Sequence, residues 1–288
     1  MSLEKSSADI YVFEINEDDD SAAANVLRMV GSRKRVLEIG AGPGSISRPM
    51  VQRNNCAVTA LELDPKCVPI LETFCERVIQ GDLNGSAWTS QLDPESFDVI
   101  VIADVLEHLV NPWRTLQQVV PLLKHGGYVV SSIPNASHCT ILANFANDDV
   151  GYRDWGLLDR THVRFFGVKN IQALFEQAGL RITRAAYVVR PPEVTEFAEL
   201  WQRLPQEQRR TFESGAFAQV YQTVVVAEVE RFTHSPPFVL LRNPPKRARL
   251  HPYHRLFGPP FRQWVRTFAR QVTTPGIRRA IKRTLGLR

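Results

Sequence analysis

The densest group of residues able to do chemistry lies between Arg35 and Ile46, in the stretch R-V-L-E-I-G-A-G-P-G-S-I. Gly40, Gly42 and Gly44 fall within five residues there, and glycine lets the backbone turn sharply and approach a ligand where a Cβ would collide. The acidic Glu38 precedes the glycines. A dinucleotide fingerprint has the spacing G-x-G-x-x-G, one residue longer than the spacing found here. The pattern predicts a nucleotide-sized binding site at a turn from a strand into a helix.

The elements around this turn predict an α/β fold. Val36 to Ile39 is an apolar run typical of a strand buried in a parallel sheet, and Ser45 is expected to cap the helix that follows. Further apolar runs predict strands, which alternate with helical patterns, so we expect right-handed crossovers and a doubly wound, mostly parallel sheet. The expected strands are 57–62, 77–80, 97–102, 128–133, 180–189 and 219–230. The expected helices are 21–30, 45–54, 66–74, 112–123 (closed by Gly126 and Gly127) and 169–178.

Composition is that of an ordinary globular protein with 44% hydrophobic residues in 288. The four cysteines form no C-x-x-C pair and have no closely spaced histidine, so we expect free thiols in a reducing compartment and no metal site. The polar, acidic start is unlike a secretory leader, and no apolar run is long enough to span a bilayer. We therefore expect a cytoplasmic protein.

Charge is distributed unevenly along the chain. Residues 231–288 carry 14 basic and no acidic side chains, whereas all 30 acidic residues lie before them. Within this tail, 261–272 and 277–287 show helical patterns, and Phe261, Trp264 and Phe268 recur beside arginines. The pattern favours an amphipathic helix on an anionic membrane surface, at the inner face of the membrane. A solvated terminus is the second interpretation, and nucleic-acid binding is the least favoured.

Four motifs in order resemble those of class I S-adenosylmethionine (SAM)-dependent methyltransferases. The first is E-x-G-x-G-x-G at 38–44, and the others are A-L-E-L-D-P at 60–65, Q-G-D-L at 80–83 and F-D-V-I-V-I-A-D-V-L-E-H-L at 97–109. The resemblance implies a Rossmann-like, seven-stranded sheet in which the last strand is antiparallel and lies beside strand six. It also implies SAM as the cofactor.

The resemblance implies the following cofactor site. Glu38 and the three glycines shape the turn, and Glu62 holds the ribose hydroxyls, a role for which Asp64 is a competitor unless Asp64 caps the next helix. Asp82 contacts the adenine amine, although Asp82 also suits a plain turn, and Leu83 beside it binds the cofactor. Asp104 and Val105 line the cofactor. For Glu107 and His108 a functional role and a helix-start role stay equally open. These residues are Glu38, Gly40, Gly42, Gly44, Glu62, Asp64, Asp82, Leu83, Asp104, Val105, Glu107 and His108.

Two insertions, 134–168 and 191–218, interrupt the alternation and are expected over the carboxyl ends of the strands. The second shows helical patterns at 196–201 and 207–212. The sequences of residues 132–138 and 156–166 resemble those of a bacterial subgroup of these methyltransferases that is associated with cell-surface polysaccharide and other glycan pathways. We expect the first insertion to be a lid, with His162 as general base and His138 and Tyr152 as weaker candidates. For His162 the slightly favoured interpretation is instead that Asp159, Arg160 and His162 form a polar network that braces the lid.

The sequence therefore predicts an N-terminal segment (1–20), a SAM-binding domain (21–230) and a basic extension (231–288). The favoured function is O-methylation of a sugar hydroxyl in a glycan or lipid-linked saccharide. A small-molecule or quinone-type O-methyltransferase is the nearest alternative, and a non-catalytic SAM-binding scaffold is a second. An NAD-dependent oxidoreductase is disfavoured by the glycine spacing. The sequence leaves the acceptor, the position methylated and the oligomeric state open.

Overall fold

The computed structural model describes residues 11–248, and these form two compact units. The first unit comprises 11–137, 152–188 and 220–244 of the described residues. The second comprises 138–151, 189–219 and 245–248, and therefore contains part of each predicted insertion. The expected tail helices at 261–272 and 277–287, with the membrane prediction that depends on them, lie outside the described residues.

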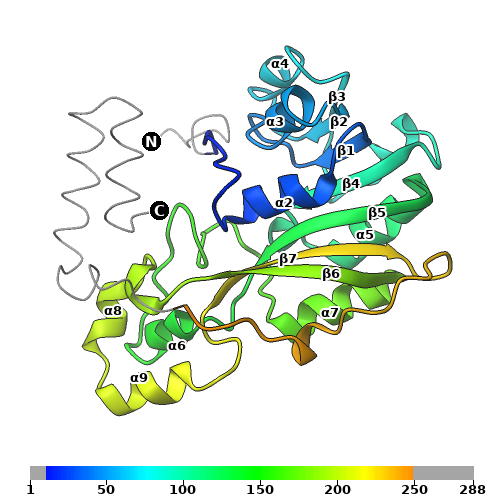
Figure 1. Cartoon of the computed structure of the whole chain (residues 1–288). Coiled ribbons are helices and arrows are strands. Elements are labelled where there is room, and N and C mark those ends of the chain that lie inside the picture. Colours follow the sequence, from blue (N-terminus) through cyan, green and yellow to red (C-terminus); the bar gives the residue numbers. More distant parts are fainter. Residues whose placement is uncertain (1–10, 249–288) are drawn as a thin grey trace. The chain divides into compact units, whose positions relative to one another are not determined.

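A seven-stranded sheet organises the first unit, with the strand order β3-β2-β1-β4-β5-β7-β6 (Figure 1). β1, β2, β3 and β4 pair in parallel, β4 pairs in parallel with β5, and β5 pairs antiparallel with β7. The expected Rossmann-like sheet, with strand seven antiparallel and beside strand six, is confirmed. The strands are β1 (Arg35–Ile39), β2 (Ala57–Glu62), β3 (Arg77–Gln80), β4 (Phe97–Ala103), β5 (Leu123–Pro134), β6 (Leu180–Val189) and β7 (Val220–Val229).

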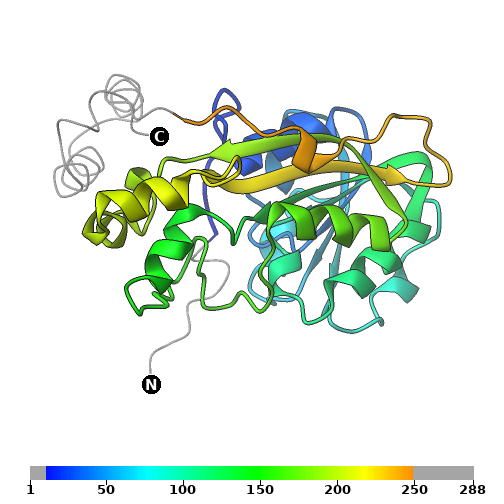
Figure 2. The ribbon, with the colours of Figure 1, turned by 90° about the horizontal axis from the view of Figure 1, so that it is seen from below.

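Helices cover both faces of this sheet, which explains why the central strands are largely apolar. α2 packs against β4, β5 and β7, α3 packs against β2, and α5 packs against α7 (Figure 2). The α-helices of the first unit are α2 (Ala22–Val30), α3 (Ser47–Gln52), α4 (Val68–Leu71), α5 (Pro112–Val119) and α7 (Val168–Gln177). Its 3-10 turns are η1 (Thr89–Gln91), η2 (Leu106–His108), η3 (Val120–Leu122) and η5 (Leu240–Arg242).

Two local predictions were wrong. α3 begins at Ser47 after an Ile46 N-cap with no side-chain bond, so Ser45 does not cap it. Gly126 and Gly127 do not close a helix but lie inside β5, where the register against β4 shifts between Phe97 and Val99. A Cβ on Gly127 would lie 3.1 Å from the Phe97 carbonyl oxygen, so glycine relieves a tight approach of the two backbones there.

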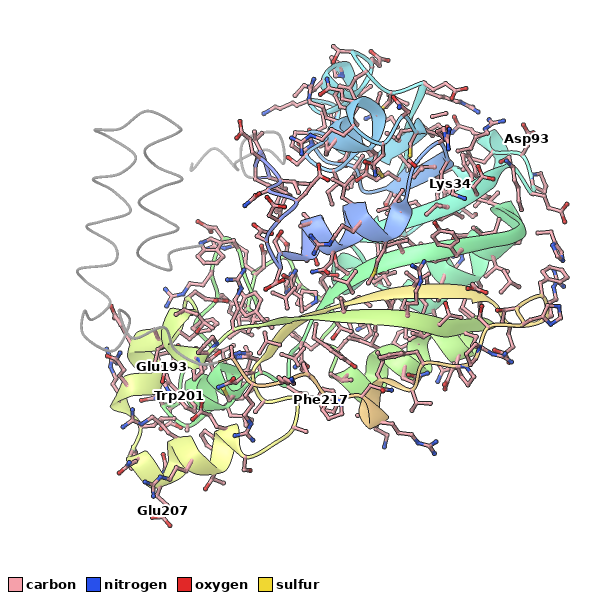
Figure 3. All side chains as sticks on the ribbon, viewed as in Figure 1. Lys34, Asp93, Glu193, Trp201, Glu207 and Phe217 are labelled. Atoms are coloured by element: carbon pink, nitrogen blue, oxygen red, sulfur yellow. The ribbon has the colours of Figure 1, made fainter. Side chains whose placement is uncertain are left out.

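The second unit has its own small apolar core. It contains α6 (Cys139–Phe145), η4 (Pro192–Val194), α8 (Ala198–Arg203) and α9 (Gln206–Glu213). Trp201, labelled in Figure 3, packs with Cys139, Ala143, Leu204 and Ala218. The helices expected in the second insertion are thus present as α8 and α9, whereas α6 was not expected in the stretch treated as a lid loop.

Residues 231–244, expected to begin the extension, pack on the first unit. The Phe238 N–H donates to the Ile182 carbonyl at 2.8 Å, and the Tyr187 hydroxyl donates to the Leu240 carbonyl at 3.1 Å. Leu240 is fully buried. Among residues 11–248, no helix combines the length and the apolar character needed to cross a bilayer.

Candidate active site

The glycine turn follows β1, and all three of its glycines have positive φ angles, of 69°, 54° and 85°. A Cβ on Gly40 would lie 2.6 Å from Val105 Cγ2, and a Cβ on Gly44 would lie 2.4 Å from Phe74 Cζ. A Cβ on Gly42 would meet nothing within 4 Å. Gly40 and Gly44 are therefore required for packing, while the backbone at Gly42 borders open space.

Glu62 ends β2 beside this turn and is 7% exposed. Its Oε2 accepts a hydrogen bond from the Gly42 N–H at 2.6 Å, and its Oε1 accepts one from the Asp64 N–H at 2.8 Å. Each carboxylate oxygen keeps a further lone pair for a hydroxyl donor. Asp64 Oδ1 accepts from the Lys66 N–H at 2.9 Å, so its carboxylate caps the following turn.

Glu38 is buried inside the fold, 3% exposed, and accepts a hydrogen bond from the Ser47 hydroxyl. Burial is the main cause that raises the pKa of the Glu38 carboxyl, to about 8. The hydrogen bond from Ser47 lowers this pKa, and the nearby charge of Glu62 raises it. Its contact with Ser47 joins β1 to α3. Glu38 therefore supports the glycine turn from behind.

Asp82 and Leu83 lie in the loop after β3. Asp82 Oδ1 accepts from the Asn84 N–H at 2.9 Å, which is the geometry of a turn. Asn84 Oδ1 accepts from the Val110 N–H at 3.0 Å, so this loop is bonded to the segment after η2. The adenine contact of Asp82 stays a prediction.

Residues 11–20 of the predicted N-terminal segment are held against the glycine turn and α3 by hydrogen bonds and an ion pair. The Ser45 hydroxyl donates to the Tyr11 carbonyl at 2.8 Å and accepts from the Phe13 N–H at 3.1 Å. Glu17 forms an ion pair with Arg53 at 2.8 Å. Burial, and next the charge of Asp159, raise the pKa of the Tyr11 phenol, which also contacts the Thr161 side chain. Sequence reasoning missed these contacts because they join residues more than thirty positions apart.

Asp104 follows β4 with a φ of 52°, an uncommon value for a residue with a side chain. Its Oδ1 accepts from the Ser132 hydroxyl at 2.9 Å, and both its oxygens accept from the Gln222 amide at 2.9 and 3.0 Å. Burial raises the pKa of Asp104. Three strands thus hold this carboxyl, and Val105 beside it packs against Gly40.

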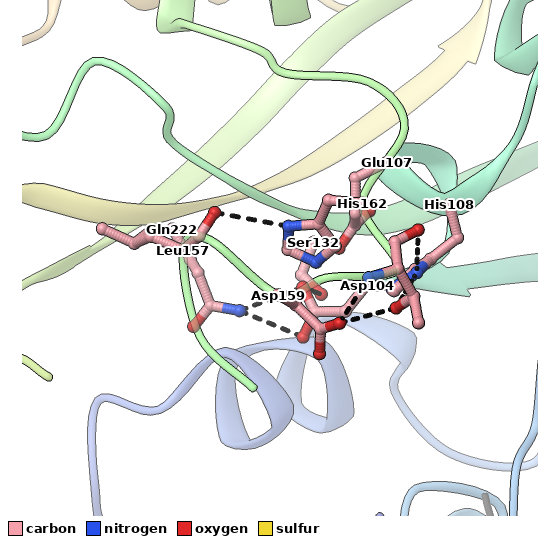
Figure 4. A network of polar contacts seen from close by, with 9 residues as sticks. Asp104, Glu107, His108, Ser132, Leu157, Asp159, His162 and Gln222 are labelled. Atoms are coloured by element: carbon pink, nitrogen blue, oxygen red, sulfur yellow. Dashed lines mark hydrogen bonds and ion pairs between the residues drawn. The ribbon is translucent and has the colours of Figure 1, made fainter. Parts of the chain in front are cut away.

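Glu107, His108 and His162 come together beside Asp104 (Figure 4). His162 Nε2 lies 4.0 Å from Glu107 Oε1, and the two imidazole rings meet edge to face with centroids 4.7 Å apart. Burial, followed by Asp104, raises the pKa of Glu107 well above its usual range. Burial, followed by the neighbouring His108, lowers the pKa of His162 to about 4, and burial also lowers the pKa of His108. Both imidazoles are therefore neutral near pH 7.

The backbone of the first insertion brings His162 to this place. The Val163 and Arg164 N–H groups both donate to the Glu107 carbonyl at 2.9 Å. Asn135, near the start of this insertion, and Phe166, near its end, form an isolated parallel β-bridge. The Arg160 guanidinium instead forms an exposed ion pair with Asp154, so it takes no part in a network with His162.

The two weaker base candidates lie elsewhere. His138 belongs to the second unit and caps α6: its Nδ1 lies 2.8 Å from the Thr140 hydroxyl and its Nε2 lies 3.0 Å from the Arg190 carbonyl oxygen. Both ring nitrogens are bonded within the protein, and the role of His138 as a base stays a prediction. Tyr152 is 54% exposed, and its catalytic role stays a prediction.

The strand order, the glycine turn after β1 and the carboxylate at the end of β2 define the class I SAM-dependent methyltransferase fold. The residues fit the cofactor because Gly42 borders open space and Glu62 offers a carboxylate to two hydroxyls. The family model of the methyltransferase domain matches residues 15–185, and the chain belongs to that family.

Known proteins similar to the chain agree with this class. A ubiquinone biosynthesis O-methyltransferase of Schizosaccharomyces pombe is 34% identical over 35% of this chain and 38% of the relative. One from Ruegeria is 29% identical over 54% of this chain and 64% of the relative. A solved Bacillus halodurans structure described as a methyltransferase has a TM-score of 0.52 at 16% identity, covering 72% of this chain and 98% of the other. The alignments thus span less than two thirds of the curated relatives, and the structural likeness concerns the fold alone.

Proposed function

We propose that the protein is a SAM-dependent O-methyltransferase whose acceptor is a hydroxyl of a quinone-type small molecule. The supporting observation is that the glycine turn and the Glu107, His108 and His162 side chains both lie where strands of the same sheet end. The relatives named ubiquinone biosynthesis O-methyltransferases favour the quinone-type acceptor. The glycan acceptor, which the sequence favoured first, has no counterpart among these relatives.

On this proposal, the chain binds the cofactor with Glu62 at the ribose and the Gly42 backbone beside the adenosyl amino acid. Asp82 and Leu83 contact the adenine, and Asp104 and Val105 line the remaining side. The bound cofactor supplies a methyl group on a sulfonium sulfur, which makes the methyl an activated electrophile.

The polar cluster beside Asp104 then handles the acceptor hydroxyl. The His162 Nδ1 lies 3.3 Å from the Leu157 carbonyl oxygen. A carbonyl oxygen only accepts, so Nδ1 carries the hydrogen and Nε2 carries the lone pair. His162 is therefore placed to take the proton that the hydroxyl loses on methylation. The lid stretch that carries His162 excludes water from this side of the site.

The test is cofactor turnover by the full chain with two acceptors, a dihydroxybenzoate bearing a short prenyl chain and a soluble saccharide. We expect release of S-adenosylhomocysteine with the aromatic acceptor and none with the saccharide. Turnover with the saccharide alone would return the acceptor to the glycan class. Binding of S-adenosylhomocysteine without turnover on either acceptor would favour a SAM-binding scaffold instead.

A further inference from the structure

Residues 11–17 form a strap that is anchored at its C-terminal end. Ile15 is 7% exposed, so its side chain is buried in the first unit. The Arg53 guanidinium donates to the Ile15 carbonyl at 3.4 Å and pairs with the Glu17 carboxylate at 2.8 Å. Arg53 directly follows α3, the helix that leads away from the glycine turn. The strap is therefore attached to the same strand–turn–helix run that is proposed to hold the cofactor.

The other end of the strap is bonded to the glycine turn itself. Ser45, the residue after Gly44, donates its hydroxyl hydrogen to the Tyr11 carbonyl at 2.8 Å and accepts from the Phe13 N–H at 3.1 Å. Val12 and Phe13 are 67% and 47% exposed, so apolar burial contributes little at this end. Contacts that consist mainly of exposed hydrogen bonds open at a low cost in free energy. This end of the strap is thus able to open while the anchored end stays in place.

The Tyr11 side chain reaches from the strap to the first insertion. Its phenol forms a hydrogen bond with the Thr161 side chain. Burial is the largest cause of the raised pKa of this phenol, and the charges of Asp159, Glu107 and Asp104 add to it. Tyr11 is nevertheless 38% exposed, so a ligand has access to it. The strap therefore extends from the glycine turn to the cluster that is proposed to handle the acceptor.

The hydrogen bonds of Thr161 decide how the phenol is used. Asp159 Oδ1 accepts from the Thr161 N–H at 2.8 Å and from the Thr161 hydroxyl at 2.7 Å. The hydroxyl hydrogen of Thr161 is therefore committed to Asp159, and its oxygen is left as an acceptor for the Tyr11 phenol and for His108 Nδ1, which lies 3.0 Å away. Because the phenol hydrogen is directed at Thr161, the lone pairs of the phenol oxygen remain for a donor on a ligand.

We propose that the strap closes over the bound cofactor, and that Tyr11 is a specificity-determining residue whose phenol oxygen accepts a hydrogen bond from an acceptor hydroxyl other than the one methylated. The role of Tyr11 rests on the proposed function, whereas the covering of the cofactor does not depend on the acceptor. His162 and Tyr11 then bind two different hydroxyls. The site therefore selects an acceptor with two neighbouring hydroxyls over one with a single hydroxyl.

The first part of the experiment follows the strap by proteolysis of the full chain. Chymotrypsin cleaves after Tyr11 and Phe13, and mass spectrometry measures the fragments that begin at Val12 and Glu14. We expect saturating S-adenosylhomocysteine, whose binding is measured by calorimetry, to slow this cleavage at least about fivefold. Ser45→Ala removes both hydrogen bonds to the strap, so it should be cleaved faster and lose most of the protection.

The second part measures the preference between two acceptors, a dihydroxybenzoate bearing a short prenyl chain and its monohydroxy analogue. Tyr11→Phe should raise KM for the dihydroxy acceptor about fivefold, as expected for one lost hydrogen bond, and leave kcat within about twofold. Its KM for the monohydroxy acceptor should equal that of the wild type. Tyr128→Phe is the matched control, since the Tyr128 hydroxyl donates to the Val30 carbonyl at 2.8 Å, and its cleavage and both KM values should stay unchanged.

Each outcome bears on a separate part of the inference. Equal cleavage with and without S-adenosylhomocysteine, in a wild type that binds it, would overturn the strap. An unchanged preference between the two acceptors in Tyr11→Phe would overturn the role of Tyr11. If the strap is protected but the wild type turns over neither acceptor, the proposed function is wrong and the role of Tyr11 falls with it, while the covering of the cofactor stands. If S-adenosylhomocysteine does not bind to the wild type, both the proposed function and the strap fail.

Discussion

A methyl group placed on Gly42 tests whether the cofactor lies against this backbone. Gly42 has a φ of 54°, and a Cβ there would meet nothing within 4 Å. Placing Ala in the left-handed region destabilises the folded state by about 1–2 kcal/mol. Ala also lowers the conformational entropy of the unfolded chain, which offsets about 0.4–1 kcal/mol of that loss. The Gly42→Ala variant should therefore lose about 1 kcal/mol of stability. In a domain of this size that lowers the melting temperature by about 2–4 °C.

Gly44→Ala provides the matched comparison. It has the same kind of backbone strain, at a φ of 85°, but its Cβ would lie 2.4 Å from Phe74 Cζ and 3.1 Å from Leu71 Cδ2. Overpacking of this kind adds about 1–3 kcal/mol. The Gly44→Ala variant should therefore lose two to four times, in rough terms, the stability that Gly42→Ala loses.

The two variants separate folding from binding. Thermal and urea unfolding give the stability of each, and calorimetry with S-adenosylhomocysteine gives the affinity. We expect Gly42→Ala to bind at least about tenfold more weakly than the wild type, because its methyl occupies space assigned to the ligand and blocks the close backbone approach. Wild-type affinity in Gly42→Ala would show that the cofactor does not lie along this turn. Equal stability losses in the two variants would refute the packing argument at Phe74.

Three further predictions concern carboxyls and a histidine. Glu62→Ala should bind S-adenosylhomocysteine at least about tenfold more weakly, through loss of charge-assisted hydrogen bonds, while circular dichroism shows the fold retained. Between about pH 4.5 and about pH 8 the buried Glu38 stays protonated in the folded protein, whereas the same carboxyl loses its proton in the unfolded chain. The free energy of unfolding of the wild type should therefore fall with rising pH, by up to about 1.4 kcal/mol per pH unit. Glu38→Gln should abolish that slope, as measured by urea unfolding at several pH values. His138→Ala should cost about 1–3 kcal/mol near pH 7. Because burial lowers the pKa of His138 to about 4, acid below its unfolded pKa of 6.5 should destabilise the wild type and shrink that difference, as measured by unfolding at both pH values.

The strands could be predicted closely from the sequence because burial on both faces demands continuous apolar runs. β2, β3 and β6 have the bounds that the apolar runs indicated. Helix ends were less predictable, since tertiary contacts compete for the same polar groups. Ser45 is a good N-cap residue by type, yet its hydroxyl bonds to Tyr11 and Phe13 of the N-terminal segment instead. Gly126 and Gly127 were predicted to end a helix because paired glycines often do so. Their position at the register shift between β4 and β5 depends on strand pairing, which local sequence does not reveal.

The proposed cofactor half of the site follows more directly from the sequence than the proposed acceptor half, for a related reason. Glu38, the glycines and Glu62 belong to one strand–turn–helix–strand run, where local spacing carries the geometry. The proposed acceptor half depends on where the first insertion lies relative to the end of β4. Glu107 and His108 were open between a functional role and a helix start, and His162 was a base candidate, but nothing local relates the two segments. Two hydrogen bonds to one carbonyl, that of Glu107, align 162–164 beside η2, and this alignment turns three separately ambiguous side chains into one cluster. A sequence signal for such a cluster would be the pair E-H after one strand, with a lone His in the insertion after the next strand.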